Sequence, residues 1–403
     1  MIQEGENDMY SEMMYQYGSQ RSVIREIFAY GQEKIRELGP DAVFDFSLGN
    51  PSIPAPDSVK EAVFDILEQE SPIAVHGYTA AQGDLQVRQN LADSVNRRFQ
   101  ITVGPYNFYL TCGAAASLCC AIRALTNPGD EWIVFAPYFP EYKCFVMAAA
   151  GVVKEVPPRL PDFQVDLAKF EETISEKTKA VIINSPNNPS GAVYSKETVQ
   201  EMTDILKKKE KEYGHPIFLI ADEPYREIVY GDVEVPYLPE YYEDTIVCYS
   251  YSKSLSLPGE RIGYILVPDQ VTESEKIYSA VCGAGRSMGY VCAPSLFQRV
   301  IGKCVDDIGD IEAYKKNRDL LYGSLTDLGY ECVKPDGAFY LFVKTLEPDA
   351  NEFCRKAREK YNLLLVPSDS FGCSGYMRVS YCVAYDMIER ALPLFEQLKK
   401  DYE

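Results

Sequence analysis

The chain has 403 residues and a formal net charge of -20, with 46% hydrophobic and 25% charged residues. This length exceeds what one compact core needs, so we expect two domains with enough interior to bury a small ligand. The acidic balance disfavours nucleic acid or an anionic membrane surface as a partner, and an anionic ligand must then meet a local cluster of arginines or backbone amides.

The middle of the chain has the pattern of an α/β sheet. Helical periodicity over residues 22–38 comes first, and from about residue 106 to 267 short apolar runs alternate with amphipathic stretches, as a mostly parallel sheet with crossover helices requires. Buried strands are expected over residues 131–136, 180–184, 217–221 and 245–249. Ligands of such sheets gather at the carboxyl ends of strands, where Asn188, Asp222 and Lys253 all fall.

The pattern changes after about residue 289. It predicts a long helical stretch over 295–328, a short apolar segment over 337–343, a helix over 350–360 and another apolar segment over 376–383. This is typical of a smaller α+β domain, which the N-terminal segment joins. We therefore expect a large domain over residues 50–289 and a small domain formed by residues 1–49 and 290–403.

One lysine lies in a chemically suggestive setting. Ser250-Tyr251-Ser252-Lys253 places an amine beside hydroxyl groups, and Arg261 follows eight positions later. A lysine that is partly neutral forms a Schiff base with an aldehyde, and a hydroxyl with a guanidinium suits a phosphate. The stretch suggests pyridoxal phosphate chemistry, although most Ser-Lys pairs are exposed surface residues.

Two other polar residues follow predicted strands. Asp222 comes directly after the apolar run 218–221, so we expect a buried carboxylate in need of a cationic partner, such as a protonated pyridine nitrogen; a helix cap is the alternative. Asn188 lies in the Pro- and Gly-containing turn 184–191, which fixes the backbone and presents an amide, but which also fits a plain surface turn.

Together these motifs resemble a known family. The matching set is Asn188-Pro189-Ser190-Gly191, Asp222 with Tyr225, Ser250 to Lys253, and Arg261. Their order and approximate spacing are those of the fold-type I aminotransferases, and from residue 49 to 378 the chain resembles class I/II members, most closely the bacterial aspartate-aminotransferase-like branch. The resemblance implies pyridoxal 5'-phosphate as cofactor and an α/β fold with a large domain around a mostly parallel sheet and a smaller α+β domain. It also implies ping-pong transfer of the amino group of an L-amino acid to a 2-oxo acid.

The resemblance assigns roles around the cofactor ring. Lys253 corresponds to the lysine that forms the Schiff base and later moves the proton at the substrate Cα. Asp222 corresponds to the partner of the pyridine nitrogen, and Asn188 and Tyr225 to the pair that hydrogen-bonds the phenolic oxygen. Such hydrogen bonds lower the pKa of the Schiff base, so that it reacts near neutral pH.

The same resemblance assigns the phosphate site. Gly113, Ala114 and Ala115 precede or begin a predicted helix whose backbone amides would bind an anion, together with Ser250 and Arg261. Relatives often have a hydroxyl group near Ala114. We therefore expect the backbone amides, Ser250 and Arg261 to make a larger share of the contacts with the phosphate here.

An aromatic residue and a neighbouring subunit complete the implied cofactor site. Phe139, rather than Tyr138, corresponds to the ring that stacks on the cofactor, although two core aromatics after a strand are the simpler reading of this pair alone. Tyr78 corresponds to the tyrosine that reaches the phosphate of the neighbouring subunit, which implies a homodimer with shared active sites.

Substrate binding is assigned to Arg378, which corresponds to the arginine that grips the α-carboxylate as a two-pronged fork, with Gly49 and Asn188 beside it. The side-chain specificity stays open among acidic, aromatic and small neutral amino acids. Candidates for recognising the side chain are the segment 21–24, Arg286 for a second carboxylate, and Tyr15 or Tyr17 for an aromatic ring.

Two alternatives remain at this stage. A carbon-sulfur β-lyase of the same superfamily would share every cofactor residue. An aminotransferase-like fold retained as a regulatory module is the other alternative, but the complete set of lysine, aspartate and arginine argues against it.

Cysteine usage and hydropathy indicate the compartment. The twelve cysteines are too sparse for a disulfide scaffold, and no Cys/His spacing suits a metal, so reduced thiols and no metal site are expected. The longest apolar run, about residues 144–153, is much shorter than the ~20 residues of a membrane helix. The acidic residues 1–8 lack the features of an export signal, so we predict a cytoplasmic protein.

Overall fold

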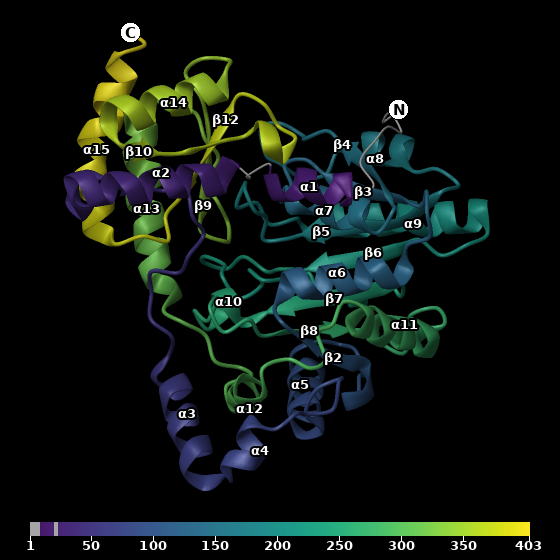
Figure 1. Cartoon of the computed structure of the whole chain (residues 1–403). Helices are drawn as coiled ribbons and strands as arrows, with labels where there is room; N and C mark the ends of the chain where they lie inside the picture. Colours follow the sequence, from purple (N-terminus) through teal and green to yellow (C-terminus); the bar gives the residue numbers. More distant parts are fainter. Residues whose placement is uncertain (1–8, 20–22) are drawn as a thin grey trace.

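A computed structural model of the chain describes residues 9–19 and 23–403. Its largest element is a seven-stranded sheet in the order β2-β8-β7-β6-β5-β3-β4 (Figure 1). The strands are β2 (Phe108–Thr111), β3 (Glu131–Phe135), β4 (Val152–Val156), β5 (Thr178–Asn184), β6 (Phe218–Asp222), β7 (Thr245–Ser250) and β8 (Gly263–Leu266). β8 pairs antiparallel with both β2 and β7, and the other pairs in the sheet are parallel. The four predicted strands are confirmed as β3, β5, β6 and β7.

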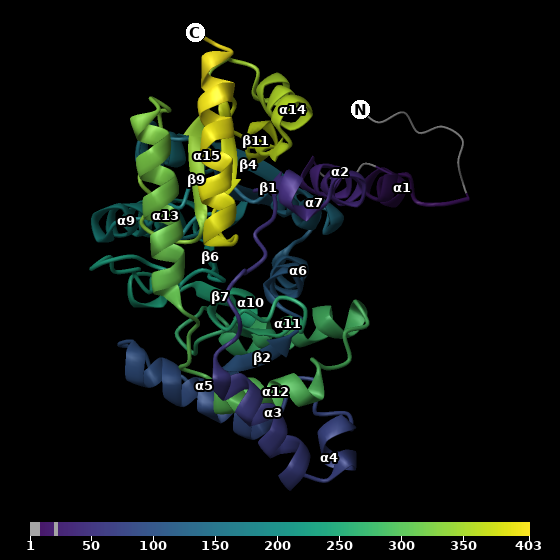
Figure 2. The ribbon, with the colours of Figure 1, turned by 90° about the vertical axis from the view of Figure 1, so that its left-hand side faces the viewer.

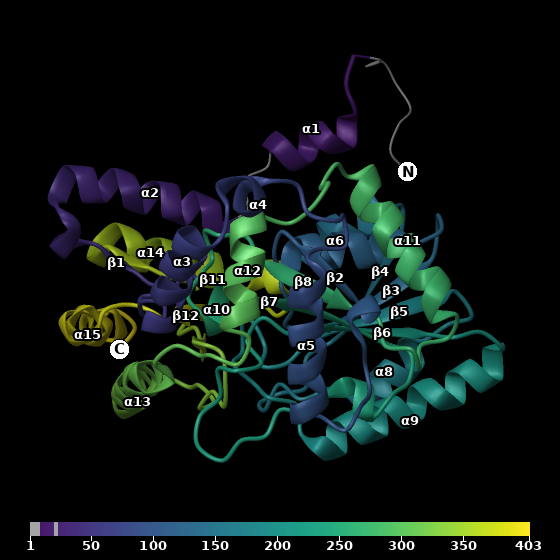
Figure 3. The same ribbon diagram turned by 90° about the horizontal axis from the view of Figure 1, so that it is seen from below.

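The central strands are apolar throughout because both faces of the sheet are covered. In β3, Trp132 and Val134 belong to a core formed with α6, α7 and α11, whereas Ile133 and Phe135 belong to the core on the opposite face, formed with α5, α9 and α12. Figure 3 shows α6 and α11 on one side of the sheet and α5 and α9 on the other. Burial on both faces explains the continuous apolar run, and each fully buried large side chain contributes about 1.5–3 kcal/mol. The sheet therefore provides a rigid support for the loops at its carboxyl edge.

The helices vary widely in length. They are α1 (Glu12–Ser19), α2 (Val23–Leu38), α3 (Asp57–Gln69), α4 (Pro72–His76), α5 (Leu85–Arg98), α6 (Ala114–Leu125), α7 (Glu141–Ala148), α8 (Leu167–Thr173), α9 (Lys196–Tyr213), α10 (Tyr251–Ser254), α11 (Ser274–Ser287), α12 (Ser295–Lys303), α13 (Ile311–Asp327), α14 (Ala350–Tyr361) and α15 (Tyr385–Lys400). Within residues 9–19 and 23–403, none of them combines the length and the apolar character needed to cross a membrane.

A separate core, distinct from the two that cover the large sheet, lies beside that sheet. It contains the three-stranded antiparallel sheet β11-β12-β9 and the parallel pair β1-β10, covered by α13, α14 and α15 (Figure 2). These strands are β1 (Phe44–Asp45), β9 (Tyr340–Lys344), β10 (Leu363–Leu364), β11 (Val366–Pro367) and β12 (Tyr376–Ser380). Because β1 pairs with β10, the N-terminal segment joins the C-terminal part of the chain.

The prediction of one long helix over 295–328 is wrong, because the chain forms two helices there, α12 and α13. Between them the N–H of Gly309 donates to the Ser254 carbonyl at 2.7 Å, and the Asp310 side chain caps α13 by accepting from the Ala313 N–H. The helix α12 packs on α3 and α5, whereas α13 packs on α15. Gly309 and the capping residue Asp310 are local signals of a helix start, so the sequence also carries a mark of the break.

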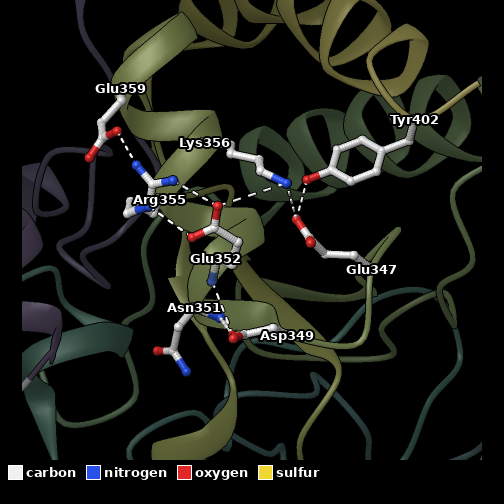
Figure 4. A network of polar contacts seen from close by, with 8 residues as sticks. All are labelled: Glu347, Asp349, Asn351, Glu352, Arg355, Lys356, Glu359 and Tyr402. Atoms are coloured by element: carbon white, nitrogen blue, oxygen red, sulfur yellow. Dashed lines mark hydrogen bonds and ion pairs between the residues drawn. The ribbon is translucent and has the colours of Figure 1, made fainter.

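Polar contacts fasten the C-terminus to α14 (Figure 4). Asp349 caps this helix, and Lys356 within it donates to Glu347 at 3.0 Å. The Tyr402 hydroxyl donates to the same Glu347 carboxylate. Partly exposed pairs of this kind contribute little individually, but together they fix where α15 ends.

Candidate active site

A cavity of about 290 Å³ lies at the carboxyl ends of β5, β6 and β7. The expected convergence of distant segments on this edge of the sheet is found. The predicted residues that line the cavity are Gly49, Ala114, Ala115, Phe139, Asn188, Asp222, Tyr225, Ser250, Lys253, Arg261 and Arg378.

Lys253 lies on the short helix α10, directly after β7. Ser250 begins this helix, and its side chain accepts from the Ser252 N–H, so the turn holds the lysine at the strand end. The Lys253 Nζ donates to the Gly49 carbonyl at 2.5 Å. Burial lowers the pKa of Lys253 to about 8; the Cys382 thiol opposes this shift, and Arg378 and Arg261 add to it. A substantial fraction of the amine is therefore neutral and nucleophilic just above neutral pH.

Asp222, the last residue of β6, is a buried carboxylate without a cationic side-chain partner. Its side chain is 5% exposed, and its Oδ2 accepts from the Tyr142 hydroxyl at 2.5 Å. Among the residues that the structure describes, none makes a hydrogen bond with the buried Oδ1 atom. Burial raises the pKa of Asp222 to about 7, against the hydrogen bond from Tyr142 and with a contribution from Glu223. The free oxygen fits a protonated ring nitrogen.

Arg378, on β12, has one N–H group without a partner. Its Nη1 donates to Asn188 Oδ1 at 2.9 Å and its Nη2 to the Ser47 carbonyl at 2.6 Å, whereas the buried Nε has no partner. The guanidinium lies 4.6 Å from the centre of the Tyr340 ring. A buried cation with an unused donor suits a carboxylate ligand.

The N-terminus of α6 forms an anion cradle with Arg261. Gly113 has φ +89°, and a Cβ there would come 2.8 Å from Arg261 Nη2, so only glycine lets the guanidinium approach the start of the helix. Ser250 and Ser252 also line the cavity, with their hydroxyl oxygens 2.7 Å apart, and Ser252 Oγ lies 3.5 Å from Arg261 Nη1. Backbone amides, hydroxyls and a guanidinium together fit a phosphate group.

The aromatic residue Phe139 lies in the wall of the cavity, next to a second cavity. Phe139 lines the cavity, whereas the neighbouring Tyr138 is buried elsewhere and donates its hydroxyl to Glu155 at 2.7 Å. Phe139 also lines a second cavity of about 300 Å³, which it shares with Ile24. The two cavities are adjacent, and Tyr17 lines only the second one.

Several sequence candidates lie away from the cavity. Tyr78 is 90% exposed in the turn after α4, and Arg286 and Tyr15 are exposed as well, so the expectation that Tyr15 lines a pocket is not met. Arg21 and Ser22 lie outside the described residues. Among the residues that the structure describes, no His/Cys/Asp/Glu group could hold a metal ion.

Sequence reasoning missed several residues at the site, four of which make informative contacts. Ser252 and Tyr340 line the cavity, Tyr142 contacts Asp222, and the Cys382 Sγ lies 3.6 Å from the Leu48 carbonyl, next to the backbone that Lys253 contacts. Ser252 lies inside the recognised lysine motif, so its position could have indicated a role. Tyr142 and Tyr340 belong to no motif.

The comparisons with known proteins agree with this geometry. Residues 41–393 match the model of the family described as aminotransferase class I and II. The chain is 30% identical to the aspartate aminotransferase of Thermotoga maritima over 358 residues, 88% of this chain and 90% of that protein. It is 30% identical to the aspartate/prephenate aminotransferase of Thermus thermophilus over 374 residues, 91% of this chain and 93% of that protein. A crystal structure of an aminotransferase from Eubacterium rectale has a TM-score of 0.96 and 55% identity, covering 98% of this chain and 100% of that one.

The chain belongs to the class I and II aminotransferases. It is a pyridoxal-phosphate-dependent transaminase with the fold-type I architecture, which confirms the predicted fold class, cofactor and reaction. Its substrates are amino acids and 2-oxo acids. The β-lyase alternative is not favoured.

Proposed function

We propose that this class I and II aminotransferase works through Lys253, Asp222 and Arg378, in a ping-pong cycle between an L-amino acid and a 2-oxo acid. One observation carries the proposal: a partly neutral amine, an unpartnered carboxylate oxygen and an unpartnered guanidinium N–H converge on one cavity. These are the three groups that amino-group transfer on a ring cofactor needs.

Different residues of the cavity would bind different parts of the cofactor. When bound, pyridoxal phosphate supplies a ring that accepts electron density from the substrate Cα. Asp222 Oδ1 would pair with the ring nitrogen, and the side chains of Asn188 and Tyr225 would bind the phenolic oxygen. Phe139 would lie against the ring.

The phosphate would be held by the N-terminus of α6. The amides of Gly113, Ala114 and Ala115 lie at the positive end of the α6 dipole, Ala114 and Ala115 line the cavity, and Ser250 and Arg261 would add a hydroxyl and a full positive charge. The glycine at the start of the helix supports this assignment, because any side chain there would displace Arg261.

Lys253 would hold the cofactor covalently and then move a proton at the substrate Cα. A pKa of about 8 lets the same amine act as a nucleophile, and as a base once it is released. Its contact with the Gly49 carbonyl holds the Nζ beside the segment that would receive the substrate carboxylate.

The substrate carboxylate would bind Arg378, Asn188 and the backbone of Gly49. Asn188 already accepts from Arg378, so the guanidinium is held in place before a substrate binds. Fixing the carboxylate at one end places Cα within reach of Lys253.

The substrate side chain would extend toward the second cavity. Its described lining includes Tyr17, Ile24 and Phe139, together with Glu141 and Arg25. Glu141 and Arg25 carry opposite charges, so the apolar and aromatic walls favour an uncharged side chain. We propose that large uncharged side chains, aromatic ones above all, are preferred over acidic ones.

A homodimer would complete the site. Apolar side chains are exposed around α3, α4 and the following turn: Phe64 at 56%, Leu67 at 46%, Ile73 at 87% and Tyr78 at 90%. Such a group supports a subunit interface. Mixing a Lys253→Ala chain with a Tyr78→Ala chain should recover activity, because one site of the hybrid dimer keeps both residues. No recovery in isolated hybrids would count against sharing of the site.

We propose the division into a large domain over 50–289 and a small domain from 1–49 and 290–403. The separate hydrophobic cores around the large sheet and around β9 and β12 support two parts, but α12, which falls within 290–403, packs into the core of the large sheet and favours a boundary after this helix. We also propose a cytoplasmic location, which the twelve free cysteines support.

Two measurements test the proposed function. Borohydride reduction of the loaded enzyme followed by peptide mapping should label the peptide with Lys253, and Lys253→Ala should abolish the label, whereas the control Lys276→Ala on exposed α11 should not. A panel of L-amino acids should change the visible spectrum of the cofactor in single half-reactions, fastest with aromatic side chains. Label on another lysine, or pyruvate and ammonia in place of a transferred amine, would refute the proposal.

A further inference from the structure

Tyr340 lies between the groups assigned to the cofactor and those assigned to the substrate carboxylate. It is the first residue of β9, pairs with Ser380 of β12, and is 2% exposed. Its side chain lines the same cavity as Lys253. Because β9 belongs to the separate core beside the large sheet, Tyr340 brings that core into contact with residues on the edge of the sheet.

The hydroxyl of Tyr340 contacts the hydroxyl of Tyr225. The two oxygens are 2.8 Å apart and buried, and the rings meet edge to face with centroids 5.7 Å apart. Each hydroxyl has one hydrogen, so when Tyr225 donates into the cavity its oxygen is free to accept from Tyr340. A hydroxyl that accepts one hydrogen bond becomes a stronger donor in the next.

The ring of Tyr340 contacts the carboxylate-binding groups. The guanidinium of Arg378 lies over this ring at 4.6 Å. A Cβ added at Gly49 would come 1.9 Å from the Tyr340 hydroxyl oxygen, so the ring also fixes how closely the Gly49 backbone approaches. One side chain therefore contacts Tyr225, Arg378 and Gly49.

We propose that Tyr340 is a positioning residue of the reaction: its hydroxyl orients Tyr225 as a donor, and its ring supports Arg378. The proposal rests on the proposed role of Tyr225 toward the phenolic oxygen of the cofactor. The two parts are separable, because Tyr340→Phe removes only the hydroxyl and Tyr340→Leu removes the ring as well.

The hydroxyl is tested by spectral titration of the loaded enzyme. Tyr340→Phe should move the pH midpoint of the visible absorption upward by roughly half a unit, because Tyr225 becomes a weaker donor. It should also lower kcat/KM about three- to tenfold. Tyr225→Phe should shift the midpoint further in the same direction, and the double variant should match Tyr225→Phe alone, since Tyr340 acts through Tyr225.

A matched control is available in Tyr330, a buried tyrosine whose hydroxyl donates to the Phe395 carbonyl at 2.9 Å, outside the cavity. Tyr330→Phe should leave the midpoint unchanged. No effect of Tyr225→Phe would overturn the assigned role of Tyr225 and this inference with it. A shift with Tyr225→Phe and none, or a downward one, with Tyr340→Phe would overturn this inference alone.

The ring is tested by binding of 3-phenylpropionate, a carboxylate without an amino group. Tyr340→Phe should leave its Kd within about twofold, and Tyr340→Leu should raise it about three- to tenfold, because only leucine removes the aromatic face beneath Arg378. Urea unfolding of the cofactor-free variants shows whether each one folds. Equal Kd values for folded Tyr340→Leu and the parent enzyme would refute the role of the ring.

Discussion

Replacing Asp222 with asparagine should change both the activity and the pH dependence of stability. In the cofactor-free protein the pKa of Asp222 is about 7, against an ordinary value of 3.8, because burial disfavours the charged form. The hydrogen bond from Tyr142 opposes this shift, and the Glu223 carboxylate adds to it. Asparagine keeps the shape of the side chain but cannot ionise.

The sign of the stability effect follows from proton binding. The folded chain holds the Asp222 proton to higher pH than the unfolded chain, so this stabilising contribution is complete below about pH 3.8 and is lost as the pH rises through about 7. At 1.36 kcal/mol per pH unit, the full loss is about 4 kcal/mol. In Asp222→Asn, this decrease of the free energy of unfolding with rising pH should be absent.

The assay is urea unfolding of the cofactor-free protein between pH 5 and pH 8.5. Across this pH range, the free energy of unfolding of the parent protein should fall by about 2–3 kcal/mol more than that of Asp222→Asn. Asp232→Asn, the same chemical change at an exposed site, should keep the slope of the parent protein. Identical slopes for the parent protein and Asp222→Asn would refute the assignment of a raised pKa to this carboxyl.

The kinetic effect has a different origin. Asp222 Oδ1 is the unpartnered oxygen proposed to face the ring nitrogen, and removing one member of a buried ion pair costs about 3–5 kcal/mol. We therefore expect kcat/KM to fall by about two to four orders of magnitude in single half-reactions. A variant with more than about a tenth of the parent activity would contradict this pairing.

Three further substitutions test other parts of the structure. Arg378→Gln should raise KM for amino acids about 10- to 100-fold by removing charged hydrogen bonds, and an equal loss with an amine that lacks a carboxylate would contradict this. Gly49→Ala should lower the free energy of unfolding by about 1–3 kcal/mol, because the new methyl group meets Tyr340; unchanged urea unfolding would show that the ring moves aside. Glu223→Gln leaves the buried Arg226 without its charged partner, so it should lower the free energy of unfolding by about 3–5 kcal/mol in urea. Glu172→Gln, at an exposed ion pair, should leave the free energy of unfolding unchanged.

Much of the site was predictable because its residues follow short apolar strands. Asp222 and Lys253 come at or directly after β6 and β7, and strand ends of a parallel sheet meet at one edge. The apolar runs that mark these strands are local in sequence. Placing the cofactor residues around one cavity therefore required only the order of motifs and the rule for parallel sheets.

Other contacts could not be read from local patterns. Tyr142 reaches Asp222 across 80 positions of the chain, and Tyr340 reaches Tyr225 across 115. Neither tyrosine lies in a recognisable motif, because a buried tyrosine on a helix or strand looks like any core residue. The break between α12 and α13 combines a local cap, Asp310, with a hydrogen bond from Gly309 to Ser254, which is far away in sequence.

The sequence by itself determined the family, the α/β class and the residue types available for chemistry, since these depend on local periodicity and on motifs in a fixed order. Only the tertiary structure decided the chemical state of those residues. Asp222 Oδ1 and Arg378 Nε are unpartnered, and the pKa of Lys253 is lowered, because packing from distant segments removes water and supplies some partners but not others. Desolvation and hydrogen-bond supply are properties of the assembled cavity, and they turn a common Ser-Lys sequence into a reactive amine.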